Sequence, residues 1–111
     1  MPKSTEFQDY YAGELGGSLV LPEADYFAPD GPAGGLQPHG LIFLDDPWMH
    51  GRPDSEIAPP LFKTDELINY VRSCIARRMV ITLNMGIYQD GGVSPATLEQ
   101  KRALRTAVRG Y

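Results

Sequence analysis

The sequence predicts an α/β fold built from two to three βα units of a parallel sheet. Two predicted strands, 40–44 and 79–84, contain apolar runs without polar alternation, at 40–44 and 79–83, which is typical of strands covered on both faces. Each run is followed by a loop and then by a segment with helical spacing of apolar residues, at 64–77 and 94–109. This repeated order of strand, loop and helix predicts parallel strands joined by crossover connections within residues 40–111.

Residues 1–39 are expected to form a loop-rich N-terminal segment. The chain contains 12 Gly and 10 Pro residues, most of them in its first two-thirds, so much of that part must be loop. One candidate strand, 18–21, lies between Gly16-Gly17 and Pro22. The long loop after it is unusual in a small domain, and it indicates either a function or neighbouring structure.

Both predicted helices carry capping signals at their ends. Thr64 is a suitable N-cap, and Asp65 and Glu66 place negative charge on the positive end of the first helix. Pro95 stands at the first position of the second helix, and Gly110 is a suitable C-cap. These signals support the helix boundaries independently of the apolar spacing.

The size and composition are typical of a single soluble domain. The chain has 111 residues and a mass of 12.2 kDa, with 42% hydrophobic and 22% charged residues, which argues against wholesale disorder. No apolar run approaches the length of a membrane span and no signal peptide is visible, so we expect a soluble protein without a membrane partner. Its compartment is not otherwise indicated. Cys74 is the only cysteine, which excludes an intramolecular disulfide and makes a thiolate zinc site implausible.

Charge is divided unevenly along the chain. Residues 1–62 hold ten acidic and two basic side chains, whereas residues 63–111 hold four acidic and eight basic ones, for a net charge of −4. The bases lie at helical positions, and no aromatic residues interleave with them. We therefore expect solvated helix faces and no nucleic-acid partner.

Two loops follow the carboxyl ends of the predicted strands, where parallel α/β folds place their sites. The side chains of interest in these loops are Asp46, Trp48, His50, Asn84 and Tyr88. An aromatic ring can stack on a sugar, while carboxylate, imidazole and amide groups bind its hydroxyls. The sequence thus indicates a sugar site, with the alternative that Trp48 closes the core over the strand ends.

Other chemistries find less support. Asp45 and Asp46 are neighbours in a strand, so their side chains point to opposite faces and cannot converge as two glycosidase carboxylates do. His39 and His50 lack ligand-type spacing, so no metal site is predicted. No nucleophile elbow and no phosphate-binding loop is present, so we predict no cofactor.

A succession of short motifs spans about residues 40–108. The loop "PWMHG" precedes a helix beginning "TDELI", followed by "MVITLNMGIYQDGG" and a helix beginning "SPATLEQ". This succession resembles the closing part of the catalytic barrel of glycoside hydrolase family 29, the α-L-fucosidases. The matching positions are Trp48, Asp65-Glu66-Leu67-Ile68, Leu83-Asn84 with Gly86, Asp90-Gly91, Ser94-Pro95, Leu98 and Leu104.

The resemblance implies a TIM-type (β/α)8 barrel, of which this chain would supply the last units. It also implies hydrolysis of α-L-fucosides with retention, through an aspartate nucleophile and a separate acid/base carboxylate. No residue of this chain matches the nucleophile, so no catalytic residue is predicted here. The expected ligand is a fucosylated glycan or a small sugar, bound by Trp48, His50, Asp46, Asn84 and Tyr88.

A complete barrel of this kind needs roughly 250 residues, more than the 111 of this chain. Three hypotheses are therefore open. The chain is a fragment or remnant of a fucosidase-like hydrolase, inactive without the missing barrel half. Alternatively, it is a small non-catalytic α/β protein that forms a homo-oligomer or binds a partner, or it is a minimal carbohydrate-binding module. Lys101 lies on the apolar stripe between Leu98 and Leu104, which weakens packing of that helix against a barrel.

Overall fold

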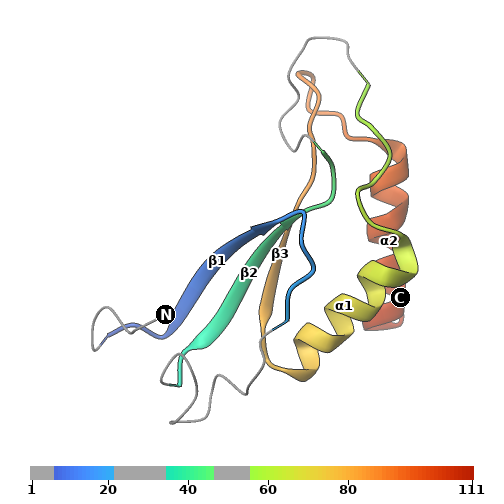
Figure 1. Ribbon diagram of the computed structural model, residues 1–111. Coiled ribbons are helices and arrows are strands. Elements are labelled where there is room, and N and C mark those ends of the chain that lie inside the picture. Colours follow the sequence, from blue (N-terminus) through green and yellow to red (C-terminus); the bar gives the residue numbers. More distant parts are fainter. Residues whose placement is uncertain (1–6, 22–34, 47–55) are drawn as a thin grey trace.

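The fold is a three-stranded parallel sheet with two helices (Figure 1). The computed structural model describes residues 7–21, 35–46 and 56–111. Along the chain, the elements are β1 (Tyr10–Gly16), β2 (Gln37–Phe43), α1 (Thr64–Ala76), β3 (Val80–Asn84) and α2 (Pro95–Arg109). The predicted α/β class, with parallel βα units, is thereby confirmed.

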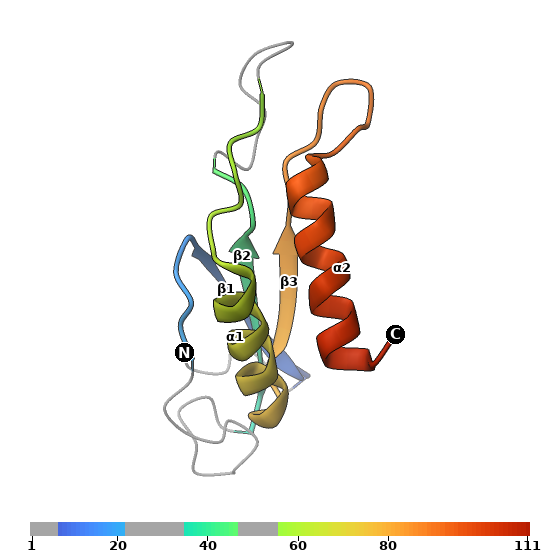
Figure 2. The same ribbon diagram turned by 90° about the vertical axis from the view of Figure 1, so that its right-hand side faces the viewer.

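The strands lie side by side in the order in which the chain makes them, β1-β2-β3. Both helices lie on the same face of the sheet (Figures 1 and 2). A doubly wound sheet would reverse its strand order at one point and place helices on both faces. In the described part of the chain, the sheet therefore grows in one direction with its helices on one side, as it does in a barrel.

The described part of the N-terminal third contains a strand at a position that the sequence did not predict. Its strand is Tyr10–Gly16 and not 18–21, and β2 begins at Gln37, ahead of the predicted start. The segment 18–21 turns away from the sheet, where Ser18 N–H donates to the carbonyl oxygen of Leu15 at 3.1 Å. Leu19 and Leu21 of this segment pack against the core from the side of the helices. Their apolar character therefore resembled that of a buried strand in the sequence.

The remaining elements lie within a residue or two of their predicted ends, apart from the early start of β2. Lys63 occupies the N-cap position of α1, so Thr64 is the first helical residue and not the cap. Gly110 ends α2 as predicted, with a φ of 79°, and its N–H donates to the carbonyl oxygen of Thr106 at 2.8 Å.

The core lies between the sheet and the helices. Side chains alternate along β2, and those facing the helices are buried. The buried hydrophobic cluster consists of Ile42, Leu44, Leu67, Tyr70, Cys74 and Leu104. The two helices also contact each other directly. The Arg72 guanidinium on α1 donates to the carbonyl oxygen of Ala107 on α2 at 2.9 Å.

The opposite face of the sheet has no helix over it in the part that the structure describes (Figure 1). His39, Leu41 and Phe43 on this face of β2 are only half-buried, and β3 has no fully buried residue. The expectation that both apolar runs are covered on both faces is therefore wrong for the described residues. The physical reason is that all described connections between the strands run on one side.

Two titratable side chains lie in the core, one helical turn apart on α1. The Tyr70 hydroxyl donates to the carbonyl oxygen of Val20 at 2.7 Å. Burial raises the pKa of the Tyr70 phenol above its usual 10.0, and a hydrogen bond with Cys74 raises it further. Burial likewise raises the pKa of the Cys74 thiol above its usual 9.0. Both groups are thus held in their neutral forms.

We expect the protein to lose stability in alkali. Both pKa values are higher in the folded than in the unfolded chain, so the stabilisation is complete below the unfolded values and is lost as the pH rises through the folded ones. Urea unfolding at about pH 7 and about pH 10.5 should give a lower midpoint at the higher pH. Tyr70→Phe should reduce this difference, and an equal difference in both proteins would show that Tyr70 is not responsible.

Candidate functional site

The carboxyl end of the sheet is organised by the carboxylate of Asp45, two residues after the end of β2. Asp45 is fully buried, and both of its oxygens are used. Oδ2 accepts the N–H of Gly86 at 2.7 Å, and Oδ1 accepts the hydroxyl of Thr97 at 2.5 Å. Since Gly86 follows β3 and Thr97 lies in the first turn of α2, one side chain joins two strand ends to a helix start.

The loop between β3 and α2 is a tight turn. Tyr88 N–H donates to the carbonyl oxygen of Gly92 at 2.8 Å, and Gly92 N–H donates to the Asp90 side chain at 2.8 Å. Gly91 has a φ of 87°, a conformation that side chains with a Cβ rarely adopt. The "QDGG" sequence is thus explained by turn geometry, and Asp90 serves the turn itself.

Three of the five predicted sugar-binding residues lie at this end of the sheet. Asp46 is exposed, in contrast to the buried Asp45, and both lie past the end of β2 and not within a strand. Asn84 is the last residue of β3 and pairs with Phe43, while Tyr88 lies four residues further along the same connection. Trp48 and His50 lie outside the described residues.

The Tyr88 hydroxyl accepts the N–H of Ile57 at 3.1 Å. This contact ties the segment before α1 to the loop after β3, so the two connections at the carboxyl end of the sheet touch. The rim therefore offers the exposed Asp46 carboxylate and the half-buried Asn84 amide as hydrogen-bonding groups. Both carboxylate oxygens of Asp45 are taken up by hydrogen bonds within the fold, so Asp45 is not among these groups.

His39 lies in the middle of the sheet and not at the rim. Its Nε2 lies 2.6 Å from the hydroxyl oxygen of Thr82 on β3, and its ring lies 6.3 Å from that of Tyr10 on β1. These three side chains connect all three strands on the face without helices. His39 thus has structural partners, and it does not join a cluster of metal ligands.

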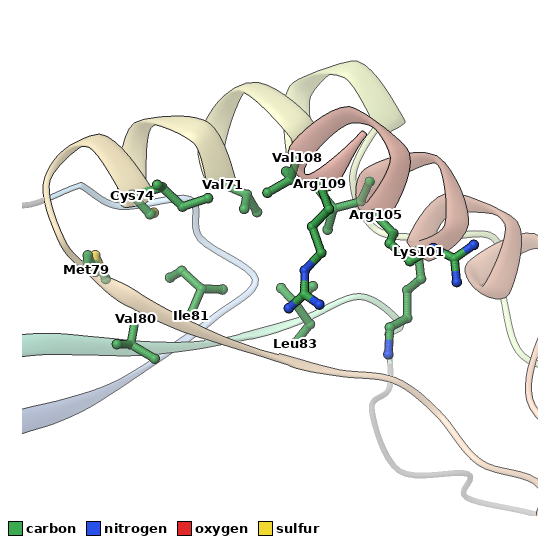
Figure 3. A pocket seen from close by; sticks show the side chains of 12 residues that line it. Val71, Cys74, Met79, Val80, Ile81, Leu83, Lys101, Arg105, Val108 and Arg109 are labelled. Atoms are coloured by element: carbon green, nitrogen blue, oxygen red, sulfur yellow. The ribbon is translucent and has the colours of Figure 1, made fainter. Parts of the chain in front are cut away.

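A groove between β3 and the helices was not predicted from the sequence (Figure 3). It has a volume of about 460 Å³ and a largely apolar lining. Its lining residues are Val71, Cys74, Ile75, Met79, Val80, Ile81, Leu83, Lys101, Leu104, Arg105, Val108 and Arg109. The sequence feature that could have indicated this groove is Lys101, which interrupts the apolar stripe of α2. Its side chain and those of Arg105 and Arg109 extend from α2 on the side of β3 (Figure 3).

Residues 7–21, 35–46 and 56–111 contain no group of three or more His, Cys, Asp or Glu side chains placed to hold a metal ion. Among these same residues, no helix is long and apolar enough to cross a membrane. Comparisons with protein-family models, with curated proteins and with solved structures found no match to this chain.

Proposed function

We propose that this protein supplies the sugar-binding rim of a larger, fucosidase-like parallel sheet and has no catalytic activity by itself. The observation that supports this most is the sheet itself, which runs β1-β2-β3 with both helices on one face. That arrangement suits a barrel segment, whose bare face would turn inward.

The proposed ligand is a fucosylated glycan or a small sugar. Asp46 and Asn84 supply a carboxylate and an amide at neighbouring strand ends, which suits hydrogen bonding to sugar hydroxyls. The buried Asp45 holds the loop after β3 in place, so these groups need little reorganisation on binding. Trp48 and His50 belong to the proposed site on sequence grounds alone.

The test is a fluorescence titration, because Trp48 is the only tryptophan. L-Fucose should produce a saturable change in emission, whereas D-galactose and D-glucose should not. Asn84→Ala should weaken fucose binding about tenfold, since removing a hydrogen-bonding partner of a bound ligand is worth about 1.4 kcal/mol. Glu99→Gln, an exposed change on α2, is the matched control and should leave binding unchanged. No response from folded protein would contradict the sugar-binding function.

A second candidate function is self-association. It is favoured by the two outer edges of the sheet, because no described residue pairs with the free side of β1 or of β3. Unpaired strand edges are templates for pairing with another chain. A molecular mass above that of the monomer in solution would support this function, and it would do so independently of any sugar response.

A further inference from the structure

We propose that the bond between Asp90 and Gly91 is a site of spontaneous modification, at which aspartate isomerises to isoaspartate. The site lies in the tight turn of the connection from β3 to α2, which extends beyond the carboxyl end of β3 (Figures 1 and 2). Neither sugar binding nor self-association plays a part in this reaction. Three features of the turn support it: the placement of the Asp90 carboxyl group, the open surroundings of Gly91 and the hydrogen bonds that hold the turn.

The carboxyl group of Asp90 is folded over the chain that follows it. Its Oδ1 accepts the N–H of Gly92 at 2.8 Å, two residues further along. A Cβ added to Gly92 would lie 3.0 Å from this oxygen and 3.8 Å from the carboxyl carbon of Asp90. Because the Gly91 nitrogen lies between Asp90 and Gly92 along the chain, a side chain that reaches the second nitrogen passes beside the first. The Gly91 nitrogen is the atom that can attack the carboxyl carbon.

The surroundings of Gly91 leave this attack unobstructed. Glycine has no Cβ, and one built at this position would have nothing within 4 Å. Asp90, Gly91 and Gly92 are all exposed, so water reaches both the carboxyl carbon and the ring that forms from it. Neither a neighbouring side chain nor burial therefore hinders the reaction.

The reaction needs water and no other reagent. The amide nitrogen of Gly91 bonds to the carboxyl carbon of Asp90 and loses its proton, while one carboxyl oxygen leaves as water, which gives a five-membered succinimide ring. Water then adds to one of the two ring carbonyl carbons and breaks its bond to nitrogen. Opening at the side-chain carbon restores aspartate, whereas opening at the main-chain carbon leaves isoaspartate, in which the chain runs through the former side chain.

The hydrogen bonds of the turn control the rate. The N–H of Gly91 donates to the carbonyl oxygen of Tyr88 at 2.9 Å, and this bond must open before the nitrogen can attack. The N–H of Tyr88 in turn donates to the carbonyl oxygen of Gly92 at 2.8 Å, which holds the turn closed. Local opening of the turn is therefore part of the barrier, so the folded chain should isomerise more slowly than the unfolded chain.

Isomerisation opens the turn. Isoaspartate adds one carbon atom to the main chain between the Cα of residue 90 and the nitrogen of Gly91. The longer chain no longer places the carbonyl oxygen of Gly92 opposite the N–H of Tyr88, whose 2.8 Å hydrogen bond closes the turn. Since the Tyr88 hydroxyl also accepts the N–H of Ile57, the tie between the two connections at this end of the sheet weakens with it.

The experiment stores the folded protein at neutral pH and body temperature and maps isoaspartate in its proteolytic peptides by chromatography and mass spectrometry. Isoaspartate should accumulate at position 90, and faster when urea unfolds the chain. Asp90→Glu keeps the carboxylate but would need a larger ring, so this position should remain unmodified. Asp90→Asn should form isoaspartate at least about tenfold faster than the wild type, because ammonia leaves an amide more readily than water leaves a carboxylate.

The chain contains a second Asp–Gly pair, Asp30-Gly31, which lies outside the described residues and serves as the internal comparison. Circular dichroism must show that both Asp90 variants remain folded. Folded protein modified at position 30 but not at 90, or at neither, would overturn the proposal. Equal rates at position 90 with and without urea would overturn the control by the turn. Hydrogen exchange of the Tyr88 and Gly91 amides should be faster in the isolated isoaspartate form, and unchanged exchange would overturn the opening of the turn.

Discussion

Replacing Asp45 with alanine should lower the free energy of unfolding by about 3 kcal/mol, because a buried carboxylate with two charge-assisted hydrogen bonds is removed. The change leaves the N–H of Gly86 and the hydroxyl of Thr97 without their acceptor. It also leaves a cavity at a fully buried position. Urea unfolding followed by circular dichroism measures the difference directly.

The neighbouring aspartate provides the matched control. Asp46 has the same side chain one residue later but is exposed, so Asp46→Ala should change stability by no more than about 0.5 kcal/mol. Asp45→Asn should lie between the two, because an amide keeps the volume but offers a single acceptor oxygen. Equal destabilisation by Asp45→Ala and Asp46→Ala would contradict the anchoring role of Asp45.

Replacing Ile42 with alanine should lower the free energy of unfolding by about 3 kcal/mol, because it removes three carbon atoms from the centre of the core. Ile42 lies on the central strand and is fully buried beneath the helices. The same substitution at Ile87, which is 57% exposed, should change stability by no more than about 0.5 kcal/mol. Similar midpoints of urea unfolding for the two variants would show that the core is not centred on β2.

Much of the secondary structure could be predicted because its signals are local. The apolar spacing and end signals of α1 and α2 lie within the segments themselves, and so does the β-branched run of β3. β1 could not be predicted in this way. Its sequence, "YYAGELG", contains two glycines and an exposed glutamate, and it is a strand because it pairs with β2.

The candidate site was predictable to a smaller extent. The prediction relied on strand alternation to separate Asp45 from Asp46, but both lie past the end of β2, where one is buried and the other exposed. The partners of Asp45 were beyond prediction, because Gly86 and Thr97 lie 41 and 52 residues away along the chain. Asn84 and Tyr88 were placed correctly at the carboxyl end of the sheet, since that follows from the βα order alone.

By itself, the sequence determined the two helices, two of the three strands and their parallel βα order, because periodicity and capping act over a few residues. The tertiary structure decided that β1 joins the sheet, that the described helices share one face, and that a cationic apolar groove lies next to β3. These features depend on contacts between distant residues. No local pattern specifies such contacts, since a pattern shows which side of an element is apolar but not what will cover it.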